Sequence, residues 1–142
     1  MKVAVEFLTR QFIDGACDET KFTAVGLLEK AEQGICLRYV EPPNEEAEGD
    51  SAAVRTTVSG GRLMIERQSP TVNSRMVLEE GCRHPCRYDT LYGGLDMHIR
   101  CDELTDELTP HGGRLFARYR VDTHGLEPLE NTLEITVKEV SE

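Results

Sequence analysis

The amino-acid sequence predicts an all-β fold: a single closed antiparallel up-and-down β-barrel of about eight strands, in one domain spanning residues 1–142. Three observations predict it. Apolar and polar residues alternate along much of the chain, which is typical of half-buried strands. Turn residues, mostly glycine-containing pairs, separate the alternating runs. The spacing leaves no room for the helical crossovers that a parallel sheet needs.

Eight segments carry the alternation, each with one apolar set that we expect to face the barrel interior. In chain order these sets are Val3, Val5, Phe7; Thr23, Val25, Leu27 (a set blurred by Phe22, Ala24 and Leu28); Ile35, Leu37, Tyr39; Val54, Thr56, Val58; Leu63, Ile65; Leu95, Met97, Ile99, Cys101; Leu115, Ala117, Tyr119, Val121; and Leu133, Ile135, Val137. The residues expected to face outward are Arg55, Arg62, Asp96, His98, Arg118 and Glu134.

Hairpin turns are expected where glycine pairs separate these runs. They are Asp14-Gly15, Gln33-Gly34, Gly60-Gly61, Gly112-Gly113 and His124-Gly125. The acidic segments 41–50 and 102–107 are interpreted as solvated loops, and 102–108 is the only stretch with weak helical potential. An open two-sheet sandwich is the alternative architecture. The barrel is favoured because closure removes exposed sheet edges.

Charge and cysteine content restrict the compartment and the partners. The chain has 16 basic and 26 acidic residues, a formal net charge of −10, which opposes binding to nucleic acid and to anionic membranes. No export signal and no membrane-spanning apolar window is visible, and five cysteines without an export signal are expected to stay reduced. We therefore expect a cytoplasmic protein, a monomer or a homodimer, that is not membrane-bound.

Several short motifs from residue 62 onward occur together in one known family. They are RLMIER at 62–67, RMVLEEG at 75–81, YDTLYG at 88–93, LDM at 95–97, GGRL at 112–115 followed by Tyr119, and NTLEI at 131–135. In this order the motifs resemble the YwiB-like family of small uncharacterised bacterial proteins with a calycin-like (lipocalin-like) β-barrel. Leu91 and Ser69 depart from the family pattern, which commonly has Pro and Gly there. The resemblance implies a barrel of about eight strands and no particular reaction.

The motifs of common enzymes and cofactor sites are missing. Cys82, His84 and Cys86 offer three zinc ligands within five residues, but no second Cys-x₂-Cys pair exists to complete a structural site. We therefore expect no metal and no cofactor. The sequence lacks a Gly-x-Ser-x-Gly elbow and a His-x-x-x-His pair, so we expect no catalytic residues and favour a role without catalysis.

A small-ligand site at one mouth of the barrel is the functional hypothesis. Arg67 has the same parity as Leu63 and Ile65, so its cation is expected on the inner face, where it would orient an anionic or amphiphilic ligand. Further hydroxyls and rings are expected from Tyr88, Thr90, Tyr92, Tyr119 and Tyr39. The simpler alternative places the Arg67 head in water and the tyrosines in an ordinary core. Other roles left open are a protein- or single-stranded nucleic-acid-interaction module and an enzyme of unidentified class.

Overall fold

The computed structural model describes residues 1–32, 34–41, 51–123 and 127–140, and within them the chain forms ten strands. They are β1 (Lys2–Ile13), β2 (Ala16–Ala31), β3 (Gly34–Glu41), β4 (Ala52–Ser59), β5 (Arg62–Gln68), β6 (Val72–Glu79), β7 (Arg83–Thr90), β8 (Gly93–Asp106), β9 (Gly112–Thr123) and β10 (Leu129–Glu139).

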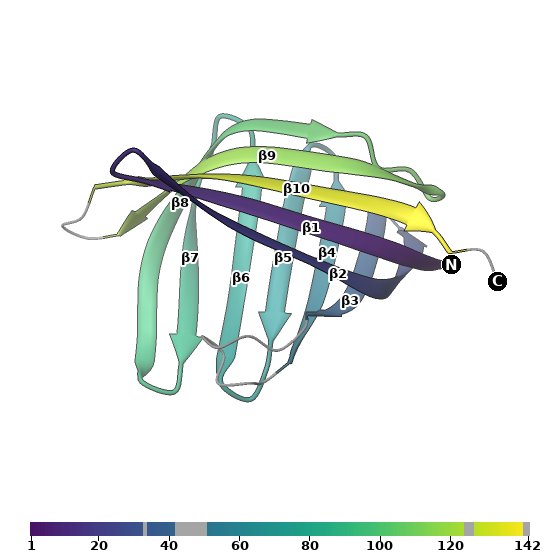
Figure 1. Ribbon diagram of the computed structural model, residues 1–142, viewed down its shortest axis with the longest axis horizontal. Coiled ribbons are helices and arrows are strands. Elements are labelled where there is room, and N and C mark those ends of the chain that lie inside the picture. Colours follow the sequence, from purple (N-terminus) through teal and green to yellow (C-terminus); the bar gives the residue numbers. More distant parts are fainter. Residues whose placement is uncertain (33, 42–50, 124–126, 141–142) are drawn as a thin grey trace.

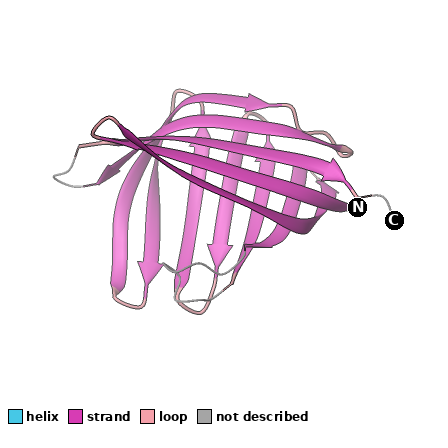
Figure 2. Ribbon diagram, in the orientation of Figure 1, coloured by secondary structure: helices cyan, strands magenta, loops and turns pink. Residues whose placement is uncertain are grey.

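The strands close into an up-and-down barrel in which each strand pairs antiparallel with its chain neighbours and β1 pairs with β10. Figure 1 shows β1, β2 and β10 crossing the near side, with β4 to β7 running steeply behind them. All regular structure in the described residues is strand (Figure 2). None of these residues belongs to a helix long and apolar enough to span a membrane. The predicted closed, all-β architecture is confirmed.

The strand number differs from the prediction of about eight because alternation did not reveal β6 and β7. In β7 the sequence RHPCRYDT contains a proline and few apolar residues. In β6, Met76 and Val77 are adjacent apolar residues and both are half-buried. Neither strand therefore has the clean contrast between two faces that marks the other eight.

The barrel interior is filled by the predicted apolar sets of seven of the eight segments. Buried members of the core are Val3, Val5, Phe7, Leu37, Tyr39, Val54, Val58, Leu63, Ile65, Ile99, Cys101, Leu115, Ala117, Tyr119, Leu133, Ile135 and Val137, with Thr56 buried among them. Of the residues expected to face outward, Arg55, Arg62, Asp96 and Arg118 are exposed, while His98 and Glu134 are half-buried.

The predicted inner face of the second segment is wrong. β1 and β2 pair with Phe7 opposite Phe22 and Val5 opposite Ala24, and directly paired residues point to the same side of a sheet. The even-numbered residues of β2 are therefore on the inner face, and Val25 and Leu27 lie outside with 60% and 50% of their surface exposed. A shift of one residue reverses a whole strand in this way.

Three further expectations are corrected in and beside β8. Leu95 has the inward parity, but it lies near the tip of the β7–β8 hairpin and is 50% exposed. The segment 102–108 is neither a loop nor a helical turn, because β8 continues to Asp106 past a bulge between Cys101 and Glu103. Gly112-Gly113 begins β9 instead of forming the turn.

Close backbone packing explains the glycine at position 113. A Cβ atom there would lie 2.1 Å from the Glu107 carbonyl oxygen. The described residues do not include 33, 42–50 and 124–126. Parts of two predicted turns and most of the first acidic segment fall on these positions. Glu41, the first residue of that segment, is described and ends β3.

Candidate ligand-binding site

The hydrogen-bonded ladder of the barrel wall is interrupted between β6 and β7, although the two strands stay side by side. β6 pairs with β5 along almost its full length, and β7 pairs with β8 from Arg83 to Thr90. Between β6 and β7 themselves only three residue pairs form, over 72–74 and 88–90. Pro85 lies in the part of β7 that pairs with β8 alone, and proline is found on such unpaired strand edges. We call this interruption the β6–β7 opening: the facing residues 75–79 and 83–87.

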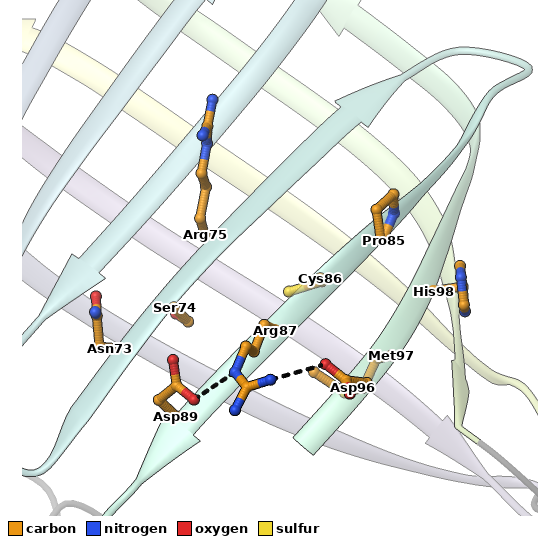
Figure 3. Close-up of a pocket in the computed structure, with 10 residues that line it drawn as sticks. All are labelled: Asn73, Ser74, Arg75, Pro85, Cys86, Arg87, Asp89, Asp96, Met97 and His98. Atoms are coloured by element: carbon orange, nitrogen blue, oxygen red, sulfur yellow. Dashed lines mark hydrogen bonds and ion pairs between the residues drawn. The ribbon is translucent and has the colours of Figure 1, made fainter. Parts of the chain in front are cut away.

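A cleft of about 630 Å³ lies over the β6–β7 opening (Figure 3). It is lined by Asn73, Ser74, Arg75, Pro85, Cys86, Arg87, Asp89, Asp96, Met97 and His98. Ser74 and Cys86 are buried, whereas Arg75, Arg87 and Asp96 are exposed. Because the lining includes residues of both faces of the sheet, the cleft leads from the outer surface towards the interior.

The outer rim of the cleft is charged. Arg87 donates from Nε to Asp89 Oδ1 at 2.7 Å, and its Nη1 lies 3.7 Å from Asp96 Oδ1 (Figure 3). The hydrogen bond to Asp89, together with the charges of both carboxylates, raises the pKa of Arg87 above its ordinary value. The rim is thus a solvated ion-pair group with little net attraction for another charge.

Arg67 lies on the inner face beside this cleft. Successive cross-strand pairs form a row of side chains along the inner face: Tyr39 is opposite Val54, Val54 opposite Arg67, Arg67 opposite Ser74, and Ser74 opposite Tyr88. Directly paired residues share a face. The row therefore places Arg67 directly opposite the cleft-lining Ser74 of the adjacent strand, although Arg67 itself does not line the cleft, and it confirms the predicted inward parity of Arg67.

The charge of Arg67 is balanced inside the barrel. Its Nε donates to Glu41 Oε2 at 3.0 Å, and the two side chains are only 25% and 18% exposed. Its Cζ lies 5.8 Å from the centre of the Phe7 ring on the opposite wall. Burial lowers the pKa of Arg67, but the carboxylate of Glu41 and the hydroxyl of Tyr39 outweigh this and raise the pKa above its ordinary value. Arg67 therefore stays charged.

The neighbourhood of Arg67 contains two of the predicted tyrosines. Burial raises the pKa of Tyr39 to about 12, and burial also raises that of Tyr119, while the positive charge of Arg67 opposes both shifts. The Tyr39 and Thr56 hydroxyls are buried without a hydrogen bond of regular geometry, although Thr56 is close enough to lower the pKa of Tyr39. The Tyr39 and Tyr119 side chains thus lie close enough to Arg67 to interact with its charge.

The other three predicted residues lie nearer the β7–β8 hairpin. Tyr88 is half-buried in the inner-face row. Thr90 Oγ1 donates to the Gly93 carbonyl at 3.0 Å and accepts from the Tyr92 N–H at 3.1 Å, so it stabilises the hairpin turn. Tyr92 belongs to that turn and is 90% exposed. The structure therefore brings Arg67, Tyr39, Tyr119 and Tyr88 to the inner face and leaves Tyr92 outside.

Several residues of the site were not assigned to a ligand site from the sequence, although Cys86 was considered as a zinc ligand. Glu41 belongs to an acidic run, which concealed its individual position. Ser74 and Cys86 belong to β6 and β7, the two strands that alternation did not identify. One feature of the sequence could have predicted a partner such as Glu41. Arg67 is an isolated arginine with inward parity, and a buried cation needs a carboxylate partner.

One group of side chains has the donor types of a metal site. Glu79, Cys82 and His84 each place a ligand atom within 4.8 Å of the other two. The set considered from the sequence was Cys82, His84 and Cys86. It does not come together, because Cys86 is buried in the core. Burial raises the pKa of the Cys86 thiol, and the positive charge of the nearby Arg67 opposes this shift with a smaller effect.

Comparisons with known proteins agree with the architecture. The chain has no significant match among curated proteins. Among solved structures it is similar to the one described as "Crystal structure of ywiB protein from Bacillus subtilis", with a TM-score of 0.86 and 16% identity, over 99% of this chain and 92% of that one. At that identity the likeness shows the fold, and the resemblance to YwiB found from the sequence motifs is confirmed. A family model described as "Domain of unknown function (DUF1934)" matches residues 5–135. The chain therefore belongs to the DUF1934 family of YwiB-like β-barrel proteins.

Proposed function

We propose that this protein binds a small anionic or amphiphilic molecule at the β6–β7 opening, with the anionic group at Arg67, and that it does so without catalysis. The observation that carries the proposal is the position of Arg67, a cation inside a barrel and one strand away from a cleft of about 630 Å³. Binding pockets for small molecules typically have volumes of about 300–1,000 Å³.

The Arg67–Glu41 pair suits an exchangeable anion site. A buried cation is costly without a counterion, and Glu41 supplies one in the unliganded protein. Glu41 accepts from Nε, and a guanidinium has four further N–H groups in a fork that matches a carboxylate or phosphate. An incoming anionic group either joins Glu41 at these donors or replaces it as the partner of Nε.

Apolar groups beside Arg67 suit the remainder of an amphiphile. Met97 and the thiol of Cys86 line the inner part of the cleft. Across the barrel, the ring of Phe7 stacks on that of Phe22 at 4.8 Å, and Phe22 lies 6.1 Å from Tyr39. This combination of apolar walls with one oriented cation is typical of sites for fatty-acid-like or aromatic acids.

The outer-face arginines favour this proposal over nucleic-acid binding. Arg120 makes a two-pronged ion pair with Asp102, Arg83 pairs with Asp122, and Arg114 pairs with Glu134. Positive charge that is already matched by carboxylates, in a chain of net charge −10, releases few counterions from a phosphate backbone.

The proposal is tested by thermal denaturation with dodecanoate and dodecyl phosphate, using dodecanol as the uncharged probe. We expect the two anions to raise the Tm by several degrees and dodecanol to raise it less, because only the anions gain from Arg67. The double variant Arg67→Met/Glu41→Gln, which removes both charges together, is expected to lose the difference between the anions and dodecanol.

Arg114→Met is the matched control. It makes the same substitution at an arginine on the outer face of β9, and it breaks the ion pair of Arg114 with Glu134. It is expected to keep the full response to both anions. A response that is retained in Arg67→Met/Glu41→Gln, or lost equally in Arg114→Met, contradicts the assignment of the anion to Arg67. The absence of any stabilisation by either anion contradicts the proposed ligand class.

A further inference from the structure

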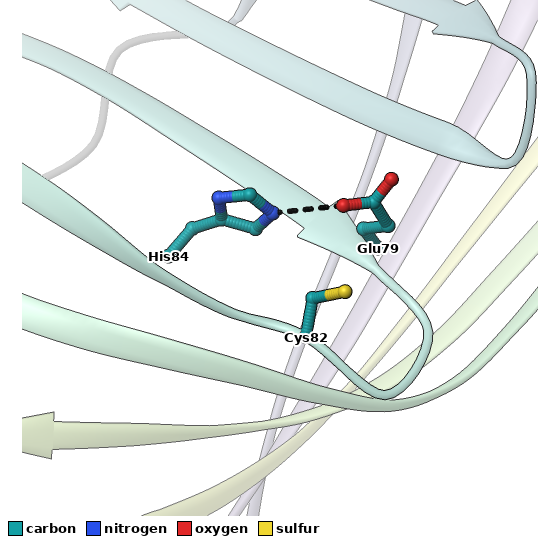
Figure 4. A group of neighbouring side chains, drawn as sticks. All are labelled: Glu79, Cys82 and His84. Carbon is teal, nitrogen blue, oxygen red and sulfur yellow. Dashed lines mark hydrogen bonds and ion pairs between the residues drawn. The ribbon is translucent and has the colours of Figure 1, made fainter.

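The turn that joins β6 to β7 gathers three metal-ligating side chains. Glu79 ends β6, Cys82 precedes β7 and His84 is its second residue. His84 Nε2 lies 3.2 Å from Glu79 Oε1, and the ligand atoms of all three residues lie within 4.8 Å of one another. Figure 4 shows the three side chains directed towards a common point beside the turn. All three are half-buried, so the group is close to solvent without being fully exposed.

The backbone holds this group in place. The Cys82 N–H donates to the Glu79 carbonyl at 2.9 Å, which closes the turn. The Gly81 N–H donates to the Cys101 carbonyl at 2.8 Å, and the Cys101 N–H donates to the Cys82 carbonyl at 3.2 Å, which fix the turn to β8. Little chain ordering therefore remains when a ligand binds, and binding sites gain affinity from such pre-organisation.

We propose that Glu79, Cys82 and His84 bind a zinc ion, with water as the fourth ligand. Thiolate, imidazole and carboxylate are the three donor types that zinc accepts, at bond lengths of about 2.0–2.3 Å. Around a tetrahedral ion those lengths separate the ligand atoms by roughly 3.3–3.8 Å. Only small side-chain movements separate this geometry from the present arrangement. No metal was predicted from the sequence, because Glu79 was not recognised there as a ligand. The end of β6 places Glu79 beside Cys82 and His84.

Charge also suits a divalent cation here. The Cys82 thiolate and the Glu79 carboxylate together neutralise Zn²⁺, with the thiol proton released to solvent when the sulfur binds. Arg62 opposes binding, since its Nη2 lies 3.7 Å from Glu79 Oε1. Its side chain is 53% exposed, so it turns away into water at small cost when the metal takes that oxygen.

The position of the group gives the metal a structural role. At one end of the β6–β7 opening, three residue pairs join the strands, and at the other end stands this turn. A zinc ion bound by Glu79 of β6 and His84 of β7 links the two strands where ladder pairs are missing. The inference is independent of the proposed ligand, because the metal group lies at the turn and not beside Arg67.

The test is a titration of the chelator-stripped full chain with Co²⁺, followed by displacement with Zn²⁺. We expect one ion per chain, a sulfur-to-cobalt charge-transfer band and the visible spectrum of tetrahedral cobalt. Cys82→Ser is expected to abolish the charge-transfer band. Glu79→Gln and His84→Gln are expected to weaken Zn²⁺ binding by more than the roughly 10- to 100-fold that loss of an outer-shell partner causes.

Two cysteine controls define the ligand set. Cys17 is exposed on the distant β2 and Cys86 is buried in the core, so Cys17→Ser and Cys86→Ser are expected to keep the band. Circular dichroism verifies that each variant is folded. The proposal is overturned if the folded wild-type chain shows no charge-transfer band, if Cys82→Ser retains it, or if Cys86→Ser loses it. Should His84→Gln fail to fold, Glu79→Gln carries the same test.

Discussion

The β1–β2 wall and the β6–β7 opening are built from the same kind of strand and differ in how much of it pairs. β1 and β2 pair continuously from Lys2 to Ile13, whereas β6 and β7 pair at three positions only. In the first region, exposed and buried residues of β1 alternate from Lys2 to Phe7, while β2 is exposed on both faces from Ala16 to Lys21. The second has polar side chains on both faces and a cleft between its strands. In this barrel, interruption of the ladder, and not loss of alternation alone, distinguishes the candidate site from the wall.

The comparison extends to charge. On the outer face, at the bulge of β8, Arg120 and the half-buried Asp102 form an ion pair, and the hydrogen bond from Arg120 lowers the pKa of Asp102. Beside the opening, Arg67 and Glu41 form their pair inside the barrel. A surface pair contributes little to stability, while an interior pair becomes costly once one member is removed.

The largest expected difference between fully paired strands and the opening concerns core packing. Leu63 of β5 is fully buried where β5 pairs with β4 and β6, so Leu63→Ala is expected to lower the free energy of unfolding by about 2–5 kcal/mol. Met97 lines the cleft and is half-buried, and Met97→Ala is expected to cost about 1 kcal/mol because water already reaches the site. Urea denaturation measures both, and equal losses would show that the cleft is packed like the core.

An intermediate effect is expected from the interior ion pair. Arg67→Met leaves the Glu41 carboxylate without its partner and is expected to cost about 1–3 kcal/mol, less than the roughly 3–5 kcal/mol of a fully buried pair. Arg120→Met on the outer wall is expected to cost about 1 kcal/mol or less. Adding Glu41→Gln to Arg67→Met is expected to recover most of the loss. No recovery in that double variant would mean that the two charges do not interact.

The smallest expected effect at neutral pH is that of Tyr39→Phe, less than about 1 kcal/mol, since the hydroxyl has no regular hydrogen bond. The stability of the wild type relative to Tyr39→Phe falls as the pH rises. Burial raises the pKa of Tyr39 to about 12, above the value of about 10 for an exposed tyrosine. The wild-type hydroxyl therefore contributes its full stabilisation below about pH 10 and loses it as the pH rises towards 12. Denaturation midpoints of the two proteins across that range test the sign, and a constant difference between them contradicts it.

The sequence predicted those parts of the molecule in which the alternation of apolar and polar residues alone determines which side chains are buried. Leu133, Ile135 and Val137 are buried as alternation requires, because β10 has one inner and one outer face. Alternation failed on β2, where residues of both parities are apolar and only the register of Phe7 opposite Phe22 selects the inner set. Arg67 was placed inside from its parity, but its partner Glu41 belongs to another strand of the barrel. Which carboxylate meets a buried cation is a property of the assembled sheet.

Amide hydrogen exchange of the unliganded protein tests the central claim, that the ladder between β6 and β7 is interrupted over most of its length. In an antiparallel sheet, alternate amides of a strand point to alternate neighbours, so about half of the amides in 75–79 and 83–87 face the opening. We expect these amides to exchange at least about 100-fold faster than the ladder amides of β1 and β2, a difference of about 2.7 kcal/mol in opening free energy. Protection equal to that of the β1–β2 ladder would show that β6 and β7 are paired along their length, and would contradict the account of the site.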